Sequence, residues 1–162
     1  MMMKTPELLL PAGSLEKMRY AFAYGADAVY AGQPRYSLRA RNNEFGLEEL
    51  GTGIAEAHAL GKKFFVASNL TPHNAKLKTY LADMAPVIAM KPDALIMADP
   101  GLIMVREAWP EIPVHLSVQA NTVNHAAVRT RPRDFPPANS PCGLTLPSTR
   151  PPSSPQPLTA KA

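Results

Sequence analysis

Short apolar segments alternate with longer amphipathic segments along the first 128 residues, and this alternation constrains the fold more than any other feature. The apolar segments span residues 7–13, 26–32, 63–69, 94–98 and 114–120. Apolar runs without polar alternation are typical of strands that are buried on both faces, as in parallel sheets covered by helices. The pattern therefore predicts an α/β fold with about five parallel strands.

The segments between these strands have helical spacing. Ser14 is a predicted N-cap, because Leu15, Met18 and Phe22 follow it at helical intervals until Gly25. Similar stripes occupy residues 47–61, 77–88 and 102–109, and Asn124 begins a further helix that ends near Val128. Pro86 is expected to bend or shorten the third of these helices, since proline lacks the backbone N–H.

Two architectures fit five such β/α units, an open doubly wound sheet and a (β/α)₈ barrel. The units average roughly 25 residues, and eight of them would need ~200 residues or more, the lower size range of a barrel. If the fold is a barrel, this chain holds a little over half of it. We therefore expect the N-terminal portion of a TIM-type barrel.

The composition changes abruptly near residue 129. Residues 130–162 contain nine of the 18 prolines in the chain, a density that excludes helices and central strands. Few apolar residues accompany them, so we expect disorder after about Val128. The predicted domains are thus 1–128, a partial barrel, and 129–162, a Pro/Ser-rich tail. Residues 130–162 carry a net charge of +3 out of +4 for the chain, so overall basicity is poor support for a nucleic-acid partner.

Cysteine usage and hydropathy limit the compartment and the chemistry. The single cysteine, Cys142, forms neither an internal disulfide nor a thiolate cluster within this chain, so no cofactor is expected from it alone. No apolar run reaches the ~18 residues of a membrane span, and no leader segment precedes the first strand. The expected location is the cytoplasm, and the sequence gives no indication of the oligomeric state.

Four sequence blocks carry a specific resemblance. They begin at Glu7 (ELLLPAGSLEK), Gly25 (GADAVYAG), Ser37 (SLRARNNEF) and Ser117 (SVQANTVN), and in this order they resemble the N-terminal part of the peptidase U32 family. The resemblance runs from about Thr5 to Val128. It implies a (β/α) barrel-type catalytic domain. Some members are collagenase-like peptidases, and the most similar branch acts in prephenate-dependent 5-hydroxylation of the wobble uridine of tRNA.

The resemblance ends where the proline-rich tail begins. Intact relatives continue with further strands and with cysteines that in several cases hold an iron–sulfur cluster, whereas this chain has proline and serine. We hypothesise that the tail is out-of-frame translation or a gene-prediction error joined to a genuine N-terminus. The alternative is a genuine linker to a partner. Resequencing that finds an intact frame encoding this tail would contradict the hypothesis.

Candidate site residues lie where strands end, because the carboxyl ends of parallel strands form the active face of such folds. The loop after the second strand contains Arg35, Arg39 and Arg41, whose guanidinium groups suit prephenate carboxylates or RNA phosphates. The alternative is a solvated basic loop neutralised by nearby glutamates. Three amides lie near the ends of strands three and five and suit the orientation of a polar substrate: Asn69, Gln119 and Asn121. Such amides also commonly cap turns.

Other reactive side chains point to structural roles. Asp99, directly before Pro100, is expected to cap a helix, and His115 and His125 to be structural. No serine lies in a G-x-S-x-G motif, and no metal-ligand spacing is present. The catalytic residues are therefore not identified by the sequence.

Three classes of function remain open. The first is an enzyme that modifies tRNA, with peptidase activity as its runner-up. The second is a fragment that binds RNA or another anion without catalysis. The third is a non-functional truncation, because half a barrel leaves sheet edges and an apolar face uncovered. We favour the third class for this polypeptide and the first for its intact relatives.

Overall fold

The computed structural model describes residues 7–38, 43–99 and 104–127. Five strands alternate with four α-helices in these ranges, which confirms the predicted α/β class. The strands are β1 (Leu9–Pro11), β2 (Ala28–Gly32), β3 (Lys63–Ser68), β4 (Ala94–Met97) and β5 (Val114–Leu116). The helices are α1 (Leu15–Ala23), α2 (Leu47–Ala59), α3 (Asn74–Ala89) and α4 (Met104–Ala108). The predicted tail, 129–162, lies outside the described residues.

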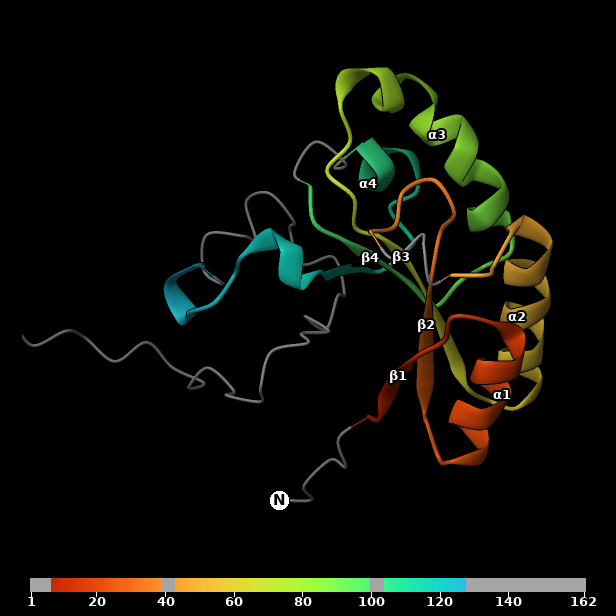
Figure 1. Ribbon diagram of the computed structural model, residues 1–162. Coiled ribbons are helices and arrows are strands. Elements are labelled where there is room, and N and C mark those ends of the chain that lie inside the picture. Colours follow the sequence, from red (N-terminus) through yellow and green to blue (C-terminus); the bar gives the residue numbers. More distant parts are fainter. Residues whose placement is uncertain (1–6, 39–42, 100–103, 128–162) are drawn as a thin grey trace, which may run out of the picture.

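The sheet is wound in chain order. All neighbouring strands pair in parallel, in the order β1-β2-β3-β4-β5. Helices α1, α2 and α3 lie on the same side of the sheet (Figure 1). A doubly wound sheet reverses its strand order and carries helices on both faces. Of the two architectures that fit the sequence, the described residues thus adopt that of consecutive units of a (β/α) barrel.

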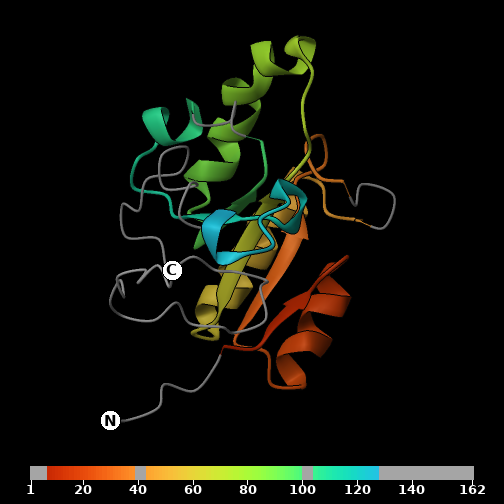
Figure 2. The same ribbon diagram turned by 90° about the vertical axis from the view of Figure 1, so that its left-hand side faces the viewer.

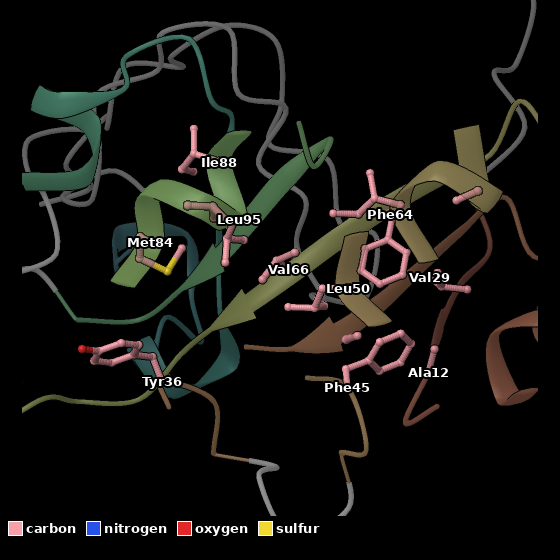
Figure 3. Close-up of a cluster of buried hydrophobic side chains, with 14 of the residues drawn as sticks. Ala12, Val29, Tyr36, Phe45, Leu50, Phe64, Val66, Met84, Ile88 and Leu95 are labelled. Carbon is pink, nitrogen blue, oxygen red and sulfur yellow. The ribbon is translucent and has the colours of Figure 1, made fainter. Parts of the chain in front are cut away.

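The main hydrophobic core lies between the helices and one face of the sheet. Val29, Phe64, Val66 and Leu95 project from β2, β3 and β4 into this layer, and each is fully buried (Figure 3). They meet fully buried side chains from the helices, including Met18, Leu50, Tyr80 and Val105. Because all four helices contribute to one cluster, burial of apolar surface holds them on the same face.

The opposite face of the sheet has its own, smaller cluster. Phe65 packs there with Ala28 and Ala94, and partly buried Tyr30 and Ile96 lie against them. Figure 2 views the molecule from this side, with β2 and β3 in front of α2. In a complete barrel this face points to the interior.

The helix boundaries test the sequence predictions directly. The predicted N-cap is confirmed, because Ser14 Oγ accepts a hydrogen bond of 3.3 Å from the backbone N–H of Lys17. Of the bend or shortening expected at Pro86, the shortening is wrong, since α3 continues to Ala89, and the bend stays a prediction. Met84, Val87 and Ile88 are buried in the core around this proline, and their packing offsets the missing backbone hydrogen bond.

The amino ends of β2 and β4 follow the same local design. Gly25 (φ 95°) and Lys91 (φ 59°) adopt the left-handed conformation, and an aspartate follows two residues later. Asp27 Oδ2 accepts the backbone N–H of Leu8 at 2.9 Å, and Asp93 Oδ2 accepts that of Phe64 at 2.8 Å. Each aspartate thus ties the start of its strand to the neighbouring strand. We call the end of the sheet where the strands begin the amino edge, and the end where the strands finish the carboxyl edge.

Candidate functional site

A cavity of about 490 Å³ opens at the carboxyl edge. The ends of β1, β2 and β3 and the segment after β5 line it, so it lies where parallel β/α folds place their active sites. Its polar lining includes Lys17, Ser37, Asn43, Asn69, His115, Ser117 and Gln119. Its apolar lining comes from the smaller cluster and from the exposed side chains of Leu38 and Val118.

Two of the predicted amides meet in this cavity. Asn69 Nδ2 lies 3.4 Å from Ser117 Oγ and 3.5 Å from Gln119 Oε1, and it donates to both oxygens. The Ser117 hydroxyl donates to Gln119 Oε1 at 2.8 Å. Asn69 Oδ1 accepts the backbone N–H of Leu38 at 3.2 Å. Both amide oxygens therefore face protein donors. The N–H groups of Asn69 are engaged by two long bonds, which a ligand oxygen can replace, and the Gln119 amide nitrogen has no hydrogen bond to another described residue.

The segment that carries Gln119 differs from its prediction. We expected a strand over residues 114–120, but β5 ends at Leu116 and Val118–Ala120 forms a 3₁₀ turn. Ser117 Oγ accepts the backbone N–H of Gln119, and Asn121 adopts the left-handed conformation (φ 51°). These local bonds replace strand pairing and turn Gln119 toward Asn69. Asn121 follows the turn and is not part of the cavity lining.

Asn43 is a cavity residue that the sequence analysis missed. Its Nδ2 donates to the carbonyl of Gly32 at 2.7 Å, which fixes the orientation of the amide. Its buried Oδ1 has no hydrogen-bond partner among the described residues. Gly32 is required here, because a Cβ at this position would lie 2.5 Å from Ser37 Oγ. Gly32 and Asn43 both lie in the sequence blocks that carry the family resemblance, but the hydrogen bond between them is seen only in the folded chain.

A lysine and a histidine contribute to the lining. Lys17 lies in the first turn of α1, and its Nζ is 3.5 Å from Glu44 Oε1 in an exposed ion pair. His115 packs edge-on against Phe65 with ring centroids 4.8 Å apart, and burial lowers its pKa. His115 is therefore mainly neutral at pH 7, so Lys17 supplies the positive charge among the lining residues.

The loop after β2 carries three predicted site residues, of which the structure describes Arg35. Arg35 lies beside α3, where its Nη1 is 2.7 Å from Asp83 Oδ2, and it does not line the cavity. The neighbouring Tyr36 is fully buried and donates from its hydroxyl to the same carboxylate at 2.6 Å. This hydrogen bond lowers the pKa of Asp83. Arg39 and Arg41 lie outside the described residues.

The arrangement favours binding of a polar group that accepts hydrogen bonds. Amide N–H groups and one ammonium group surround a partly apolar cavity, which suits a carbonyl or carboxylate oxygen on a small ring or chain. Ser117 bonds to the two amides and not to an imidazole, so the described residues contain no Ser–His pair at this site. They also contain no group of three metal-ligating side chains.

An iron–sulfur cluster does not fit the residues of this chain. Such a cluster needs about four cysteine ligands, and the sequence has one, Cys142.

In the described part of the chain no helix is both long and apolar enough to cross a membrane.

Comparisons with known proteins agree on one family. The family model for peptidase family U32 matches residues 13–133. The tRNA hydroxylation protein P of Escherichia coli is 73% identical over 125 residues, which cover 76% of this chain and 28% of that protein. The protein of the same name from Haemophilus influenzae is 72% identical over 125 residues, 76% of this chain and 27% of that protein.

A solved structure supports the fold. A U32 peptidase superposes with a TM-score of 0.63 at 15% identity, covering 83% of this chain and 58% of that one. At this identity the likeness shows the fold alone. The chain spans a little over a quarter of the length of the two bacterial relatives.

Proposed function

The chain belongs to peptidase family U32, and from this membership we propose that residues 1–128 form the first part of a barrel that hydroxylates tRNA. The observation that carries the proposal is the 73% identity over 125 residues with a relative named tRNA hydroxylation protein P. The expected reaction is prephenate-dependent 5-hydroxylation of the wobble uridine, in the cytoplasm. Because the match covers 28% of that relative, the remaining units are needed for activity.

In this proposal the cavity holds the oxygen-bearing part of a substrate. Gln119 donates N–H groups to a carbonyl or carboxylate oxygen, Asn69 donates to it by exchanging one of its two long bonds, and Ser117 keeps the Gln119 oxygen turned away from it. Lys17 adds a positive charge that favours a carboxylate. These groups bind and orient; they are not assigned a proton-transfer step. The tail, residues 129–162, has no part in the proposed activity.

A chimera tests the proposal. Residues 1–128 of this chain replace the matching segment of the Escherichia coli tRNA hydroxylation protein P in a strain that lacks that protein. Mass spectrometry of nucleosides from its tRNA then measures 5-hydroxyuridine derivatives. We expect the chimera to restore them and the 162-residue chain alone not to. A folded chimera that restores no hydroxylation, or that cleaves gelatin instead, would contradict the proposal.

Two variants of the chimera locate the site. Asn69→Ala removes a donor from the cavity and is expected to lower the hydroxylated fraction at least ~10-fold, since hydrogen bonds to charged groups contribute about 1.5 to 3 kcal/mol. Asn74→Ala is the matched control, because Asn74 is an exposed asparagine at the start of α3 that does not line the cavity. Equal activity of both variants would remove Asn69 from the proposed site.

A further inference from the structure

Two cationic side chains, Arg35 and Lys76, lie together on the loop after β2 and on α3. Lys76, in the first turn of α3, donates from Nζ to the backbone carbonyl of Arg35 at 3.3 Å. The ring of Tyr36 lies close to both, with its centroid 5.7 Å from Arg35 Cζ and 6.0 Å from Lys76 Nζ. The pair thus combines residues from the loop after β2 and from α3, 41 positions apart in the sequence.

The base of this pair is rigidly built. Tyr36 is fully buried, and Figure 3 shows its hydroxyl oxygen pointing away from the other labelled apolar side chains. That hydroxyl donates to Asp83 Oδ2 at 2.6 Å, and Thr79 Oγ1 donates to the same oxygen at 3.0 Å. Because two hydroxyls hold the Asp83 carboxylate, Asp83 fixes the position of Arg35, while the Arg35 side chain stays 56% exposed.

One carboxylate does not neutralise two cations. Asp83 bonds to a single guanidinium nitrogen of Arg35, and Lys76 bonds to a neutral carbonyl. A contrasting case is Arg19 on α1, where Nε and Nη2 both bond to the carboxylate of Glu56, at 2.9 and 2.5 Å. Arg19 is therefore matched by its own partner, whereas the Arg35 and Lys76 pair keeps an excess positive charge and unused N–H donors among the described residues.

The loop that carries Arg35 continues directly into the lining of the proposed substrate cavity. Ser37 and Leu38 follow Tyr36 directly and line the cavity, and the backbone N–H of Leu38 bonds to Asn69. A nucleotide in the cavity would therefore place its own backbone near the loop that presents Arg35. Phosphate contacts position an RNA strand, and contacts inside a pocket read the base.

We propose that Arg35 and Lys76 bind a backbone phosphate of the RNA strand whose nucleotide enters the cavity, an assignment that rests on the proposed function. The guanidinium fork supplies paired N–H donors to phosphate oxygens, and the ammonium adds a point charge from the α3 side. Tyr36 and Asp83 act as positioning residues, because they hold the arginine without touching the RNA.

Salt dependence of tRNA binding tests this assignment. Fluorescence anisotropy measures the affinity of the 162-residue chain for an unmodified tRNA transcript between 50 and 200 mM KCl. Arg35→Gln and Lys76→Gln are each expected to weaken binding and to lower the slope of log affinity against log salt by about 0.7 to 0.9. Arg35→Lys should retain most of the slope. Arg19→Gln is the matched control and should leave the slope unchanged.

The outcomes separate this inference from the proposed function. Cations of residues 129–162 contribute equally to every variant, so the differences report the replaced side chain. If all variants share one slope while tRNA still binds, the phosphate site is overturned and the proposed function stands. If the unchanged chain binds no tRNA, the phosphate site is also overturned, and hydroxylation by the chimera decides the proposed function independently. Circular dichroism melting confirms that each variant is folded.

Discussion

The two edges of the sheet hold their polar side chains in different ways. At the amino edge, Asp27 and Asp93 accept backbone N–H groups at 2.9 and 2.8 Å and join neighbouring strands. At the carboxyl edge, Asn69 donates at 3.4 and 3.5 Å to side-chain oxygens around a cavity. Short bonds to the backbone stabilise the fold, and long bonds between side chains leave donors that a ligand can claim. The aspartates of the amino edge thus join strands, whereas Asn69 at the carboxyl edge makes bonds that a ligand can replace.

The largest predicted effect tests whether hydrogen bonds are also weak on the helix-facing side of the carboxyl edge. Ser68, the last residue of β3, faces the helices, and its hydroxyl lies 2.6 Å from that of Tyr80. Burial raises the pKa of Tyr80 from its ordinary 10.0 to about 12. The unfolded chain ionises Tyr80 near pH 10, whereas the folded chain retains the proton until near pH 12. Retention of the Tyr80 proton therefore stabilises the folded chain fully below pH 10. This contribution to the free energy of unfolding, on the order of 2 to 3 kcal/mol, is lost as the pH rises to 12.

Urea unfolding between pH 7 and 12 measures this loss. Tyr80→Phe should reduce the alkaline decline in the free energy of unfolding, at a cost near neutral pH of about 1 kcal/mol for the lost hydrogen bond. Tyr24→Phe is the control, because Tyr24 is 83% exposed. An undiminished alkaline decline in Tyr80→Phe would mean that burial of the Tyr80 hydroxyl at the carboxyl edge does not stabilise the fold.

The second prediction concerns the amino edge. Asp93→Ala removes an acceptor from the backbone N–H of Phe64 and from His58 Nε2, which lies 3.0 Å from the same carboxylate. We expect the free energy of unfolding to fall by about 1.5 to 2 kcal/mol. Glu111→Ala, an exposed carboxylate after α4, is the control and should change it by less than about 0.5 kcal/mol. Equal stability of the two variants would show that the hydrogen bonds of Asp93 at the amino edge do not stabilise the fold.

The third prediction is the counterpart at the cavity. Asn69→Ala breaks two long hydrogen bonds and one of 3.2 Å, so its cost in unfolding free energy should stay below about 1 kcal/mol. Differential scanning calorimetry on this variant and on Asp93→Ala compares the edges in one experiment. A larger loss at Asn69 than at Asp93 would show that the cavity residues are part of the structural framework.

The smallest effect is an acid response at the amino edge. The hydrogen bond from the backbone of Leu8 lowers the pKa of Asp27, and Lys62 contributes to the same shift. This stabilisation is present above the ordinary pKa, about 3.9, and is lost as the pH falls through the lower folded value. Asp27→Asn should therefore flatten the pH dependence of unfolding below about pH 4. A variant that declines as steeply as the parent chain would indicate that other carboxylates dominate acid unfolding.

The sequence predicted the order of elements because each strand and helix is recorded in local patterns. Ser14 shows this well, since a capping side chain, an amphipathic stripe and a terminal glycine lie within twelve residues. The end of β5 was not predicted, because Ser117 competes for the backbone through its hydroxyl, and hydropathy does not register that competition. Pro86 also misled, because buried neighbours in the tertiary core determine its effect.

The candidate site was only partly predictable for a similar reason. Asn69 and Gln119 lie near strand ends, so the sequence placed both on the active face, and the structure shows that they also contact each other. Lys17 and Asn43 enter the cavity from a helix turn and from a loop, positions that no periodic pattern marks. Arg35 was grouped with Arg39 and Arg41 by sequence, but its contact with Asp83 depends on the distance between a loop and α3. Contacts between side chains of different units thus lie beyond local sequence rules.

The most direct test of the central claim uses two variants of the chimera with the Escherichia coli tRNA hydroxylation protein P, measured for melting temperature and for hydroxylated tRNA. We predict that Asn69→Ala loses hydroxylation with little change in melting temperature, and that Asp93→Ala melts at a lower temperature but retains hydroxylation below it. Hydroxylation at the parent level in Asn69→Ala, together with its loss in folded Asp93→Ala, would contradict the assignment of binding to the carboxyl edge.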